Sequence, residues 1–482
     1  MASFHDPIAQ LGVPVTQLTA DSRQVQPGDT FAAFPGEAGD GRKHIGAAVA
    51  AGANAVLWEM EGFEWNPQWQ VPNLAIQDLR ERIGAIASQV YGEPSQSMWV
   101  IGVTGTNGKT SCSHWLAQAL TNLGRKTALV GTLGNGFHGA LTTSTHTTPE
   151  AVSLQRQLAD YLAQGAQCVA MEVSSHGLAQ GRVNGVKFDV ALLTNLTRDH
   201  LDYHGDMQSY ARAKAALFNW PGLKHAVLNL DDTFGAELAA KLDRKQVAVL
   251  TYGIGRGDVA ASNLRVSAAG VEMDVTTQWG VAHLKSPLIG TFNAANLLGV
   301  LAVLLVSGVK LNDAVQQLAA VTPPPGRMQR LGGDGAPLVV VDYAHTPDAL
   351  EKVLQTLRDL LPQDARLICV FGCGGERDKG KRALMGDAAS RLADKVVVTS
   401  DNPRSENARA IIEDILEGMR ANYEVIEDRA DAIFQAIGVA RPIDVVLVAG
   451  KGHEAYQEIA GTRFPFSDAE VAARALQERV PC

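Results

Sequence analysis

The sequence has few cysteines and no long apolar run, and each absence disfavours a class of protein. Its five cysteines are odd in number and widely separated, which fits neither a disulfide framework nor a paired CxxC zinc site: Cys112, Cys168, Cys369, Cys373 and Cys482. We expect them to be reduced thiols. No run of about 18 apolar residues occurs, and the opening MASFHDPIAQ lacks the basic start and apolar core of a secretory signal. We therefore expect a cytoplasmic protein without membrane insertion.

A basic charge balance is also missing. The chain has 42 basic and 51 acidic residues, for a formal net charge of -9, which disfavours a nucleic-acid partner but leaves room for one basic, anion-binding cleft. Its 46% hydrophobic and 19% charged residues are typical of a folded globular protein. At 482 residues the chain is too long for one core, and its length predicts about three domains.

Two clusters of turn residues divide the chain. YGEPSQS precedes an apolar strand, and TPPPGR is the strongest helix and strand breaker in the sequence. We predict an N-terminal substrate-binding domain at 1–93, a central nucleotide-binding domain at 94–327 and a C-terminal domain at 328–482.

The rhythm of apolar runs predicts an α/β protein. The first part mixes the short β-like runs TFAAF and NAVLWE with an Ala-rich helical stretch at 44–52, which indicates a small mixed α/β domain. The second alternates runs such as CVAMEVS and DVALLTNL with helical segments, as in a parallel sheet, and 263–288 predicts a small antiparallel insertion of two or three strands. The third repeats the rhythm with PLVVVDY, RLICVF, KVVVTS and DVVLVAG, which predicts a Rossmann-like, doubly wound domain.

The stretch WVIGVTGTNGKTS, residues 99–111, carries the clearest chemistry. An apolar strand leads through a Gly-rich turn to Gly-Lys-Thr, so the backbone N–H groups from Gly105 to Thr110 could surround a phosphate. Lys109 would neutralise the β and γ oxygens, and the Thr110 hydroxyl would bind Mg²⁺. The common pattern has a glycine where this chain has Val103. We predict ATP or GTP binding at this loop.

TGTNGKT with this glycine spacing resembles the Mur ligase superfamily, which includes the folylpolyglutamate and cyanophycin synthetases. The resemblance continues, in order, through eight further stretches: MEVSSHGLAQGRV (171–183), TNLTRDHLDYHGDMQSYARAK (194–214), IGTFNAANLLG (289–299), PPPGRMQ (323–329), VVVDYAHTPDAL (339–350), FGCGGERDKGKR (371–382), SDNPRSE (400–406) and AGKGHE (449–454). Within the superfamily these stretches resemble the branch that forms the peptidoglycan tripeptide. The resemblance implies an ATP-dependent ligase that joins meso-diaminopimelate to UDP-MurNAc-L-Ala-D-Glu through an acyl phosphate.

The resemblance also implies the residues of the ATP and metal sites. The ATP-binding positions are Gly105, Thr106, Asn107, Gly108, Lys109, Thr110, Ser111, Asn293, Arg327 and Asp342. The catalytic positions are Lys109, Glu172, His200 and Lys214. Mg²⁺ would be held by Thr110, Glu172, His200 and a carbamate on Lys214 (N6-carboxylysine), whose formation requires the uncharged amine. From local context alone, Glu172 would be a strand-end carboxylate, His200 a turn residue and Lys214 a solvated cation on a helix predicted at 206–220.

The two organic substrates are assigned from the same resemblance. The UDP-MurNAc-dipeptide positions are Ala20, Ser22, Glu37, Ala38, Gly39, His146, Thr147, Thr148, Ser174, Gln180 and Arg182. His146 stands where related sequences often have Asn, and Glu37 stands where some have a neutral or basic residue. The diaminopimelate positions are Arg377, Asp401, Asn402, Pro403, Arg404, Gly450 and Glu454. The planar guanidinium of Arg404 suits the distal carboxylate, and Glu454 suits the distal ammonium.

Three alternatives remain. A lysine-adding ligase is disfavoured by Arg404, since those relatives lack an arginine in this motif. A folylpolyglutamate synthetase is disfavoured by the UDP-like segment at 20–41. A nucleotide-binding protein without catalysis is disfavoured because all four catalytic positions are intact. We expect a monomer.

Overall fold

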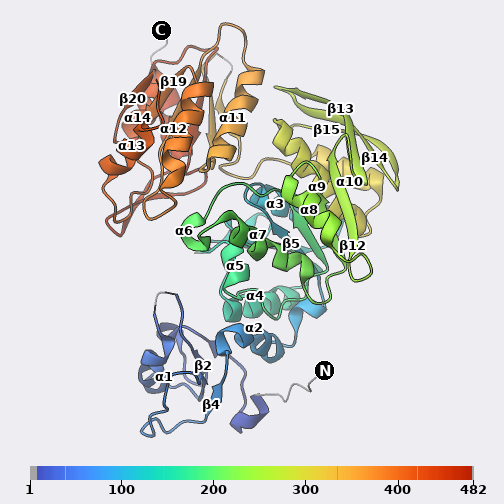
Figure 1. The fold of residues 1–482 in the computed structure, drawn as a ribbon, viewed down its shortest axis with the longest axis vertical. Helices are drawn as coiled ribbons and strands as arrows, with labels where there is room; N and C mark the ends of the chain where they lie inside the picture. Colours follow the sequence, from blue (N-terminus) through green and yellow to red (C-terminus); the bar gives the residue numbers. More distant parts are fainter. Residues whose placement is uncertain (1–7, 38, 145, 334, 421, 480–482) are drawn as a thin grey trace.

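The structure is a computed structural model that describes residues 8–479 except 38, 145, 334 and 421. Three sheets follow one another along the chain and lie in a row, with the largest in the middle (Figure 1). Each sheet contains parallel strands and is accompanied by helices, which confirms the predicted α/β class. The domain limits stay predictions, because α2 (Leu79–Val90) packs in one core with both the first sheet and Ala151 and Val152 of the central part.

The first sheet has four parallel strands in sequential order: β1 (Leu18–Thr19), β2 (Thr30–Ala33), β3 (Ala55–Glu59) and β4 (Asn73–Ile76). β2 and β3 lie within the predicted runs TFAAF and NAVLWE, and α1 (Ile45–Ala50) lies within the predicted helical stretch. The mixed α/β character of this part is therefore confirmed.

The central sheet has 11 strands in the order β15-β14-β13-β12-β11-β10-β5-β9-β6-β7-β8. Their bounds are β5 (Trp99–Thr104), β6 (Thr127–Gly131), β7 (Gly134–Phe137), β8 (Ala140–Thr142), β9 (Cys168–Glu172), β10 (Val190–Leu193), β11 (His225–Asn229), β12 (Ala248–Ile254), β13 (Val259–Ser267), β14 (Gly270–Thr277) and β15 (Gly280–Ser286). The last three are the predicted antiparallel insertion. It begins earlier than expected, at Val259, because β13 first pairs with β12 in parallel and so extends the sheet at its edge.

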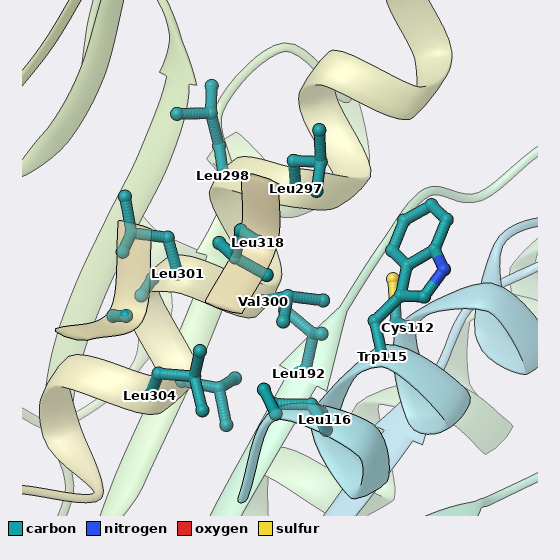
Figure 2. Packing of buried hydrophobic residues seen from close by; sticks show 14 of the residues in the cluster. Cys112, Trp115, Leu116, Leu192, Leu297, Leu298, Val300, Leu301, Leu304 and Leu318 are labelled. Carbon is teal, nitrogen blue, oxygen red and sulfur yellow. The ribbon is translucent and has the colours of Figure 1, made fainter. Parts of the chain in front are cut away.

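Eight α-helices accompany the central sheet in the described residues: α3 (Lys109–Asn122), α4 (Ala151–Ala163), α5 (Ser175–Ala179), α6 (Leu201–His204), α7 (Met207–Ala215), α8 (Thr233–Lys241), α9 (Thr291–Val306) and α10 (Leu311–Ala319). Figure 2 shows the core in which Leu297 and Leu301 of α9 pack near Leu192 of β10 and Trp115 of α3. Trp115 also donates Nε1–H to the carbonyl of Thr322 at 2.9 Å. This packing fixes the helix that starts at the phosphate loop.

The C-terminal sheet has the order β16-β17-β21-β18-β19-β20, parallel except for β16. Its strands are β16 (Gln329–Gly332), β17 (Leu338–Asp342), β18 (Leu367–Phe371), β19 (Lys395–Val398), β20 (Tyr423–Val425) and β21 (Val445–Ala449). Helices α11 (Pro347–Leu360), α12 (Gly380–Leu392) and α13 (Ala408–Leu416) cover one face, and α14 (Arg429–Gly438) and α15 (Asp468–Glu478) cover the other. Val340 packs on the first face while Val339 and Val341 pack on the second, which is the alternation of a strand buried on both sides. The predicted doubly wound domain is confirmed.

A separate hairpin, β22 (Tyr456–Ile459) and β23 (Thr462–Pro465), precedes α15. The four described cysteines are buried free thiols, and Cys482 lies outside the described residues. Within the described part of the chain, no helix combines the length and apolar character needed to cross a membrane.

Candidate active site

The phosphate loop connects the end of β5 to the start of α3. Gly105 and Gly108 have φ angles of 144° and 88°, in the region that favours glycine. A side chain at Gly105 would collide with the Thr194 hydroxyl, and one at Gly108 would come within 2.7 Å of Oδ1 of Asn296. Val103, by contrast, lies within β5 and is fully buried. The glycines therefore lie where this loop touches its neighbours, which accounts for the departure from the common spacing.

Lys109 and Thr110 begin α3, and their side chains have defined partners. Nζ of Lys109 donates to the carbonyls of Gly105 and Thr106, both at 2.8 Å. Burial lowers the pKa of Lys109, although the negative charge of Glu172 opposes the shift. A half-buried cation hydrogen-bonded to two carbonyls can accept a more strongly charged partner, such as a phosphate.

Glu172, the last residue of β9, is almost fully buried and lies against the loop. Its Oε2 accepts a hydrogen bond from the Thr110 hydroxyl at 3.1 Å, and its Oε1 accepts one from the backbone N of Thr132 at 2.8 Å. Nη2 of Arg327 donates to the same Thr110 hydroxyl at 3.1 Å. The structure thus brings together a hydroxyl, a carboxylate and a guanidinium that lie far apart in the sequence.

Lys214 lies on α7 and is only 1% exposed. Its Nζ donates to the carbonyl of Gly105 at 2.8 Å and lies 4.6 Å from the centre of the Tyr210 ring. Burial, with Lys109 nearby, holds the pKa of Lys214 well below its ordinary range. The uncharged amine that carbamate formation needs is therefore favoured, and a solvated cation is excluded by the burial. The helix ends at Ala215 and continues only as a 3-10 turn.

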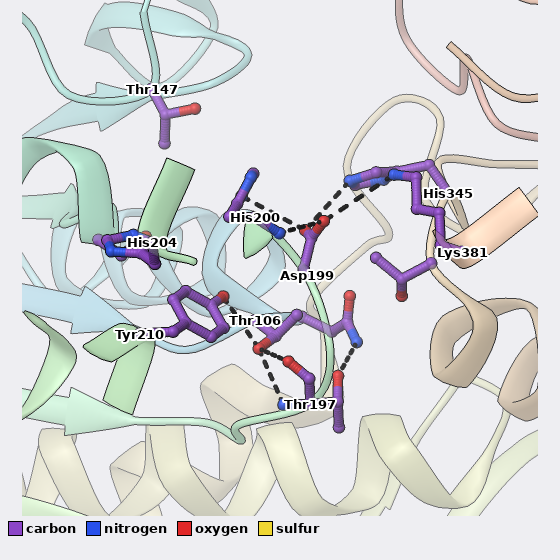
Figure 3. Close-up of polar contacts among 12 residues, drawn as sticks. Thr106, Thr147, Thr197, Asp199, His200, His204, Tyr210, His345 and Lys381 are labelled. Carbon is purple, nitrogen blue, oxygen red and sulfur yellow. Dashed lines mark hydrogen bonds and ion pairs between the residues drawn. The ribbon is translucent and has the colours of Figure 1, made fainter. Parts of the chain in front are cut away.

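His200 and Asp199 lie between the central sheet and the C-terminal part (Figure 3). Asp199 is 3.3 Å from Nε2 of His200, 3.7 Å from Nε2 of His345 and 3.9 Å from Nζ of Lys381. Burial by itself would raise the pKa of Asp199, but these three groups outweigh it and hold the pKa well below the usual range. The pKa of His200 is lowered, mainly by burial. A permanent carboxylate thus joins residues from both sides of the interface.

The fit of a divalent cation depends on substrate oxygens. No group of three or more His, Cys, Asp or Glu side chains in the described residues could hold a metal alone. Thr110 and Glu172 lie together beside the phosphate loop, whereas His200 lies against Asp199 and Lys214 against Gly105. Mg²⁺ is commonly bound by one or two protein oxygens together with substrate phosphates and waters. The Thr110–Glu172 pair fits that pattern.

A cavity of about 540 Å³ opens over the loop. It is lined by all predicted ATP positions except Gly105 and by the predicted catalytic positions Glu172, His200 and Lys214. Asp342 accepts hydrogen bonds from the backbone N of Met328 at 2.7 Å and of Ala344 at 2.8 Å, and burial raises its pKa. Asn293 donates from Nδ2 to the carbonyl of Ile289 at 2.9 Å. The cavity therefore has walls from both the central and the C-terminal sheets.

A second cavity, of about 1140 Å³, lies between the first sheet and the central part. Seven predicted UDP-MurNAc-dipeptide positions line it: Ala20, Ser22, Glu37, Gly39, His146, Gln180 and Arg182. Thr147 and Ser174 line the ATP-side cavity instead. Thr148 is buried and donates to the carbonyl of Glu172 at 2.9 Å, and Ala38 lies outside the described residues. Thus Thr147, Thr148 and Ser174 lie near Glu172 and the ATP-side cavity, and not in the second cavity with the other seven positions.

The predicted diaminopimelate positions lie at the carboxyl edge of the C-terminal sheet and line neither cavity. Arg404 has a φ of 53°, and its Nη1 donates to the carbonyl of Gly375 at 2.6 Å. Nδ2 of Asn402 donates to Oε2 of Glu454 at 2.7 Å, and a side chain at Gly450 would come within 2.6 Å of Oδ2 of Asp401. Pro403 is buried beside them, and Arg377 is exposed. Residues from two separate motifs therefore form one loop cluster.

Several residues of the site were missed by the sequence reasoning. Asp199 directly precedes His200, and Lys451 lies inside AGKGHE, so both belong to motifs that were recognised. The signal available for Lys451 was a lysine placed just after a buried apolar strand, where a charge needs a partner. Tyr210 likewise lies inside the recognised stretch at 194–214, whereas Thr132 lies outside all of the recognised stretches.

Comparison with known proteins gives matches over most of the chain. Residues 14–91 match the Mur ligase family catalytic domain, 103–304 the Mur ligase middle domain, and 326–452 the Mur ligase glutamate ligase domain. The UDP-N-acetylmuramoyl-L-alanyl-D-glutamate–2,6-diaminopimelate ligase of Chromobacterium violaceum is 57% identical over 97% of this chain and 96% of its own. The ligase of the same name from Neisseria meningitidis serogroup A is 52% identical over 99% and 100%.

Solved structures agree with these matches. A structure of a UDP-N-acetylmuramoyl-L-alanyl-D-glutamate–2,6-diaminopimelate ligase is 39% identical, with a TM-score of 0.69 over 96% of this chain and 95% of that one. The MurF ligase from Thermotoga maritima in complex with ADP is 18% identical with a TM-score of 0.68 over 97% and 99%, and shares the fold.

Proposed function

The chain belongs to the Mur ligase family, and we propose that it is the ATP-dependent ligase that adds meso-2,6-diaminopimelate to UDP-MurNAc-L-Ala-D-Glu. The γ-carboxylate of D-glutamate attacks the γ-phosphate of ATP, an amine of diaminopimelate attacks the resulting acyl phosphate, and phosphate leaves. The products are the UDP-MurNAc-tripeptide, ADP and phosphate, in cytoplasmic peptidoglycan synthesis. The observation that carries the proposal is the cavity in which Lys109, Thr110 and Glu172 meet Arg327.

The phosphate loop binds the nucleotide. Backbone N–H groups of the loop receive the phosphates. Lys109 and Arg327 add positive charge where the β- and γ-phosphates of ATP and the attacking carboxylate must approach one another. Burial strengthens these interactions, because little water competes with them. Asn293 and Asp342 line the same cavity and hold the nucleoside side of ATP.

Thr110, Glu172, His200 and Lys214 as its carbamate are the residues that would hold Mg²⁺. The ion would neutralise charge on the phosphates and on the attacking carboxylate. The contact between Thr110 and Glu172 supports one Mg²⁺ position, and the buried amine of Lys214 supports a position for a second Mg²⁺ that its carbamate would help to hold.

The organic substrates approach from opposite sides. The cavity between the first and central parts receives the UDP-MurNAc-dipeptide, and the cluster of Arg404 and Glu454 receives diaminopimelate. Asp199 with its partners His345 and Lys381 joins the central and C-terminal parts, which helps to exclude water from the acyl phosphate. The protein acts on small molecules as a monomer and binds no nucleic acid.

Phosphate release tests the proposal directly. Purified protein with ATP, Mg²⁺ and UDP-MurNAc-L-Ala-D-Glu should release phosphate rapidly only when diaminopimelate is added. Lysine and glutamate, the acceptors of the alternative ligases, are measured in parallel. Faster release with lysine would assign the chain to the lysine-adding branch, and release with glutamate on a folate substrate would assign it to the folylpolyglutamate branch. A protein that binds ATP but ligates none of these acceptors would have no ligase function.

A further inference from the structure

Another buried lysine lies in the acceptor cluster, and none of the roles above uses it. Lys451 follows β21 and is 0% exposed. Its Nζ donates to Oδ1 of Asn402 at 2.9 Å and to Oε2 of Glu454 at 3.0 Å. Because Asn402 also donates to that Glu454 oxygen, the three side chains form one closed hydrogen-bonded triangle.

The triangle fixes the orientation of both partners. Oδ1 of Asn402 accepts from Lys451 and from the backbone N of Glu458 at 2.9 Å, so its amide has one favourable orientation. Both donors to Glu454 bind Oε2, and no described residue hydrogen-bonds Oε1. One carboxylate oxygen is therefore held by the protein while the other is left for a donor on the acceptor.

Lys451 also changes the charge that the acceptor meets. An ammonium 3.0 Å from Glu454 compensates much of its negative charge in a site with little water. The distal centre of diaminopimelate carries an ammonium and a carboxylate, with no net charge, whereas the distal end of lysine carries an ammonium alone. A compensated Glu454 gives the bare ammonium of lysine less attraction than an uncompensated one.

We propose that Lys451 is a positioning residue that sets acceptor specificity: it orients Asn402 and Glu454 and compensates the charge of Glu454, so that an acceptor with a distal ammonium and carboxylate is preferred over one with an ammonium alone. This inference rests on the proposed function of the acceptor cluster.

The test is Lys451→Met, which keeps the length of the side chain and removes its charge. We expect kcat/KM for diaminopimelate to fall about 10- to 100-fold, mainly through KM, because Asn402 and Glu454 lose their orientation. Lysine should lose less or gain, so the preference for diaminopimelate over lysine should fall about tenfold or more. KM for ATP and for the UDP-MurNAc-dipeptide should change less than about twofold, since both bind elsewhere.

The matched control is Lys395→Met. Lys395 begins β19 and pairs with Glu424 at 3.0 Å, so the change removes the same charge from the same sheet away from the acceptor cluster. We expect the preference to stay at the wild-type value. A folded Lys451→Met protein that keeps the wild-type preference, or that loses all three substrates equally, would overturn the proposal.

Glu454→Gln supplies a second variant if Lys451→Met does not fold. It leaves the ammonium of Lys451 without its carboxylate, so lysine should lose more than diaminopimelate and the preference should rise; an unchanged or lower preference contradicts the inference. Wild-type protein that does not use diaminopimelate would refute the proposed function itself, which separates the two failures.

Discussion

Lys214 and Lys451 are both buried in the proposed active site, but their surroundings differ. Nζ of Lys214 donates a hydrogen bond to the carbonyl of Gly105 and lies near Lys109. No described carboxylate forms an ion pair with Lys214. Nζ of Lys451 lies 3.0 Å from the Glu454 carboxylate. Burial without an anion favours the uncharged amine, whereas a nearby carboxylate offsets the cost of burying the charge.

The difference separates two tasks within one reaction. On the proposed ATP side, burial favours the uncharged amine that carbamate formation needs, beside the loop that we propose binds phosphate. On the proposed acceptor side, Lys451 is paired with Glu454 and hydrogen-bonded to Asn402, in the cluster that we propose recognises an amino acid. The same residue type thus serves chemistry or recognition according to whether an acid lies within hydrogen-bond distance.

The largest effect is expected from removing Lys214, which has a hydrogen bond to Gly105 but no ion pair with a described carboxylate. Lys214→Ala should lower kcat by about 10³-fold or more, because the carbamate that would help to hold Mg²⁺ is lost. Acetate or formate at millimolar concentration should restore part of the activity by supplying a carboxylate to the vacated space. The measurement is phosphate release with and without the added acid.

Lys451→Met is the matched control for this rescue. Its lost group is an ammonium, so acetate should not help it. Near-normal turnover of Lys214→Ala without any added acid would show that the carbamate has no role in the reaction.

The next effect concerns the acceptor side. Arg404→Ala should lose roughly 2 to 4 kcal/mol of transition-state binding for diaminopimelate, a factor of about 30 to 1000 in kcat/KM, because a bidentate pair with the distal carboxylate is removed. Lysine should gain little, and Arg404→Lys should also be poor because an ammonium lacks the planar geometry. If Arg404→Ala uses diaminopimelate as well as wild type does, the acceptor assignment is wrong although the ligase may stand.

The two sides also differ in how far the sequence could predict them. The phosphate loop is local: strand, glycine turn and helix follow within 99–111, and Lys109 and Thr110 are placed as expected. The contact between Asn402 and Lys451 depends on strand order, because these residues follow β19 and β21, which β18 separates in the sheet. No periodicity in the sequence specifies that order.

The end of α7 and the partners of the Asp199 carboxylate were not predicted, for similar reasons. The end of α7 at Ala215 depends on the burial of Leu217 and Phe218 in the following 3-10 turn, which is a tertiary effect. The position of Asp199 among His200, His345 and Lys381 needs three elements from two sheets to meet. Family resemblance supplied the positions of the acceptor residues, but not their hydrogen-bond partners.

The smallest expected effect is a pH dependence of stability that should distinguish the two lysines. Burial lowers the folded-state pKa of Lys214 below its ordinary value of 10.5. Between those two values the unfolded chain binds the additional proton, so this residue makes the free energy of unfolding rise with pH, by up to about 1.4 kcal/mol per unit. Replacing Lys214 by methionine removes this dependence.

This pH dependence is measured by urea unfolding of wild type and Lys214→Met at pH 7, 8 and 9, in buffer free of CO₂. The stability advantage of Lys214→Met over wild type should be largest at pH 7 and shrink towards pH 9, because the wild-type chain gives up its proton on folding at progressively lower cost. Lys451→Met, which leaves the Glu454 carboxylate without its ammonium, should instead be less stable than wild type at all three values. A difference between Lys214→Met and wild type that does not change with pH would mean that Lys214 keeps its proton in the folded protein, and the contrast between the two lysines would then fail.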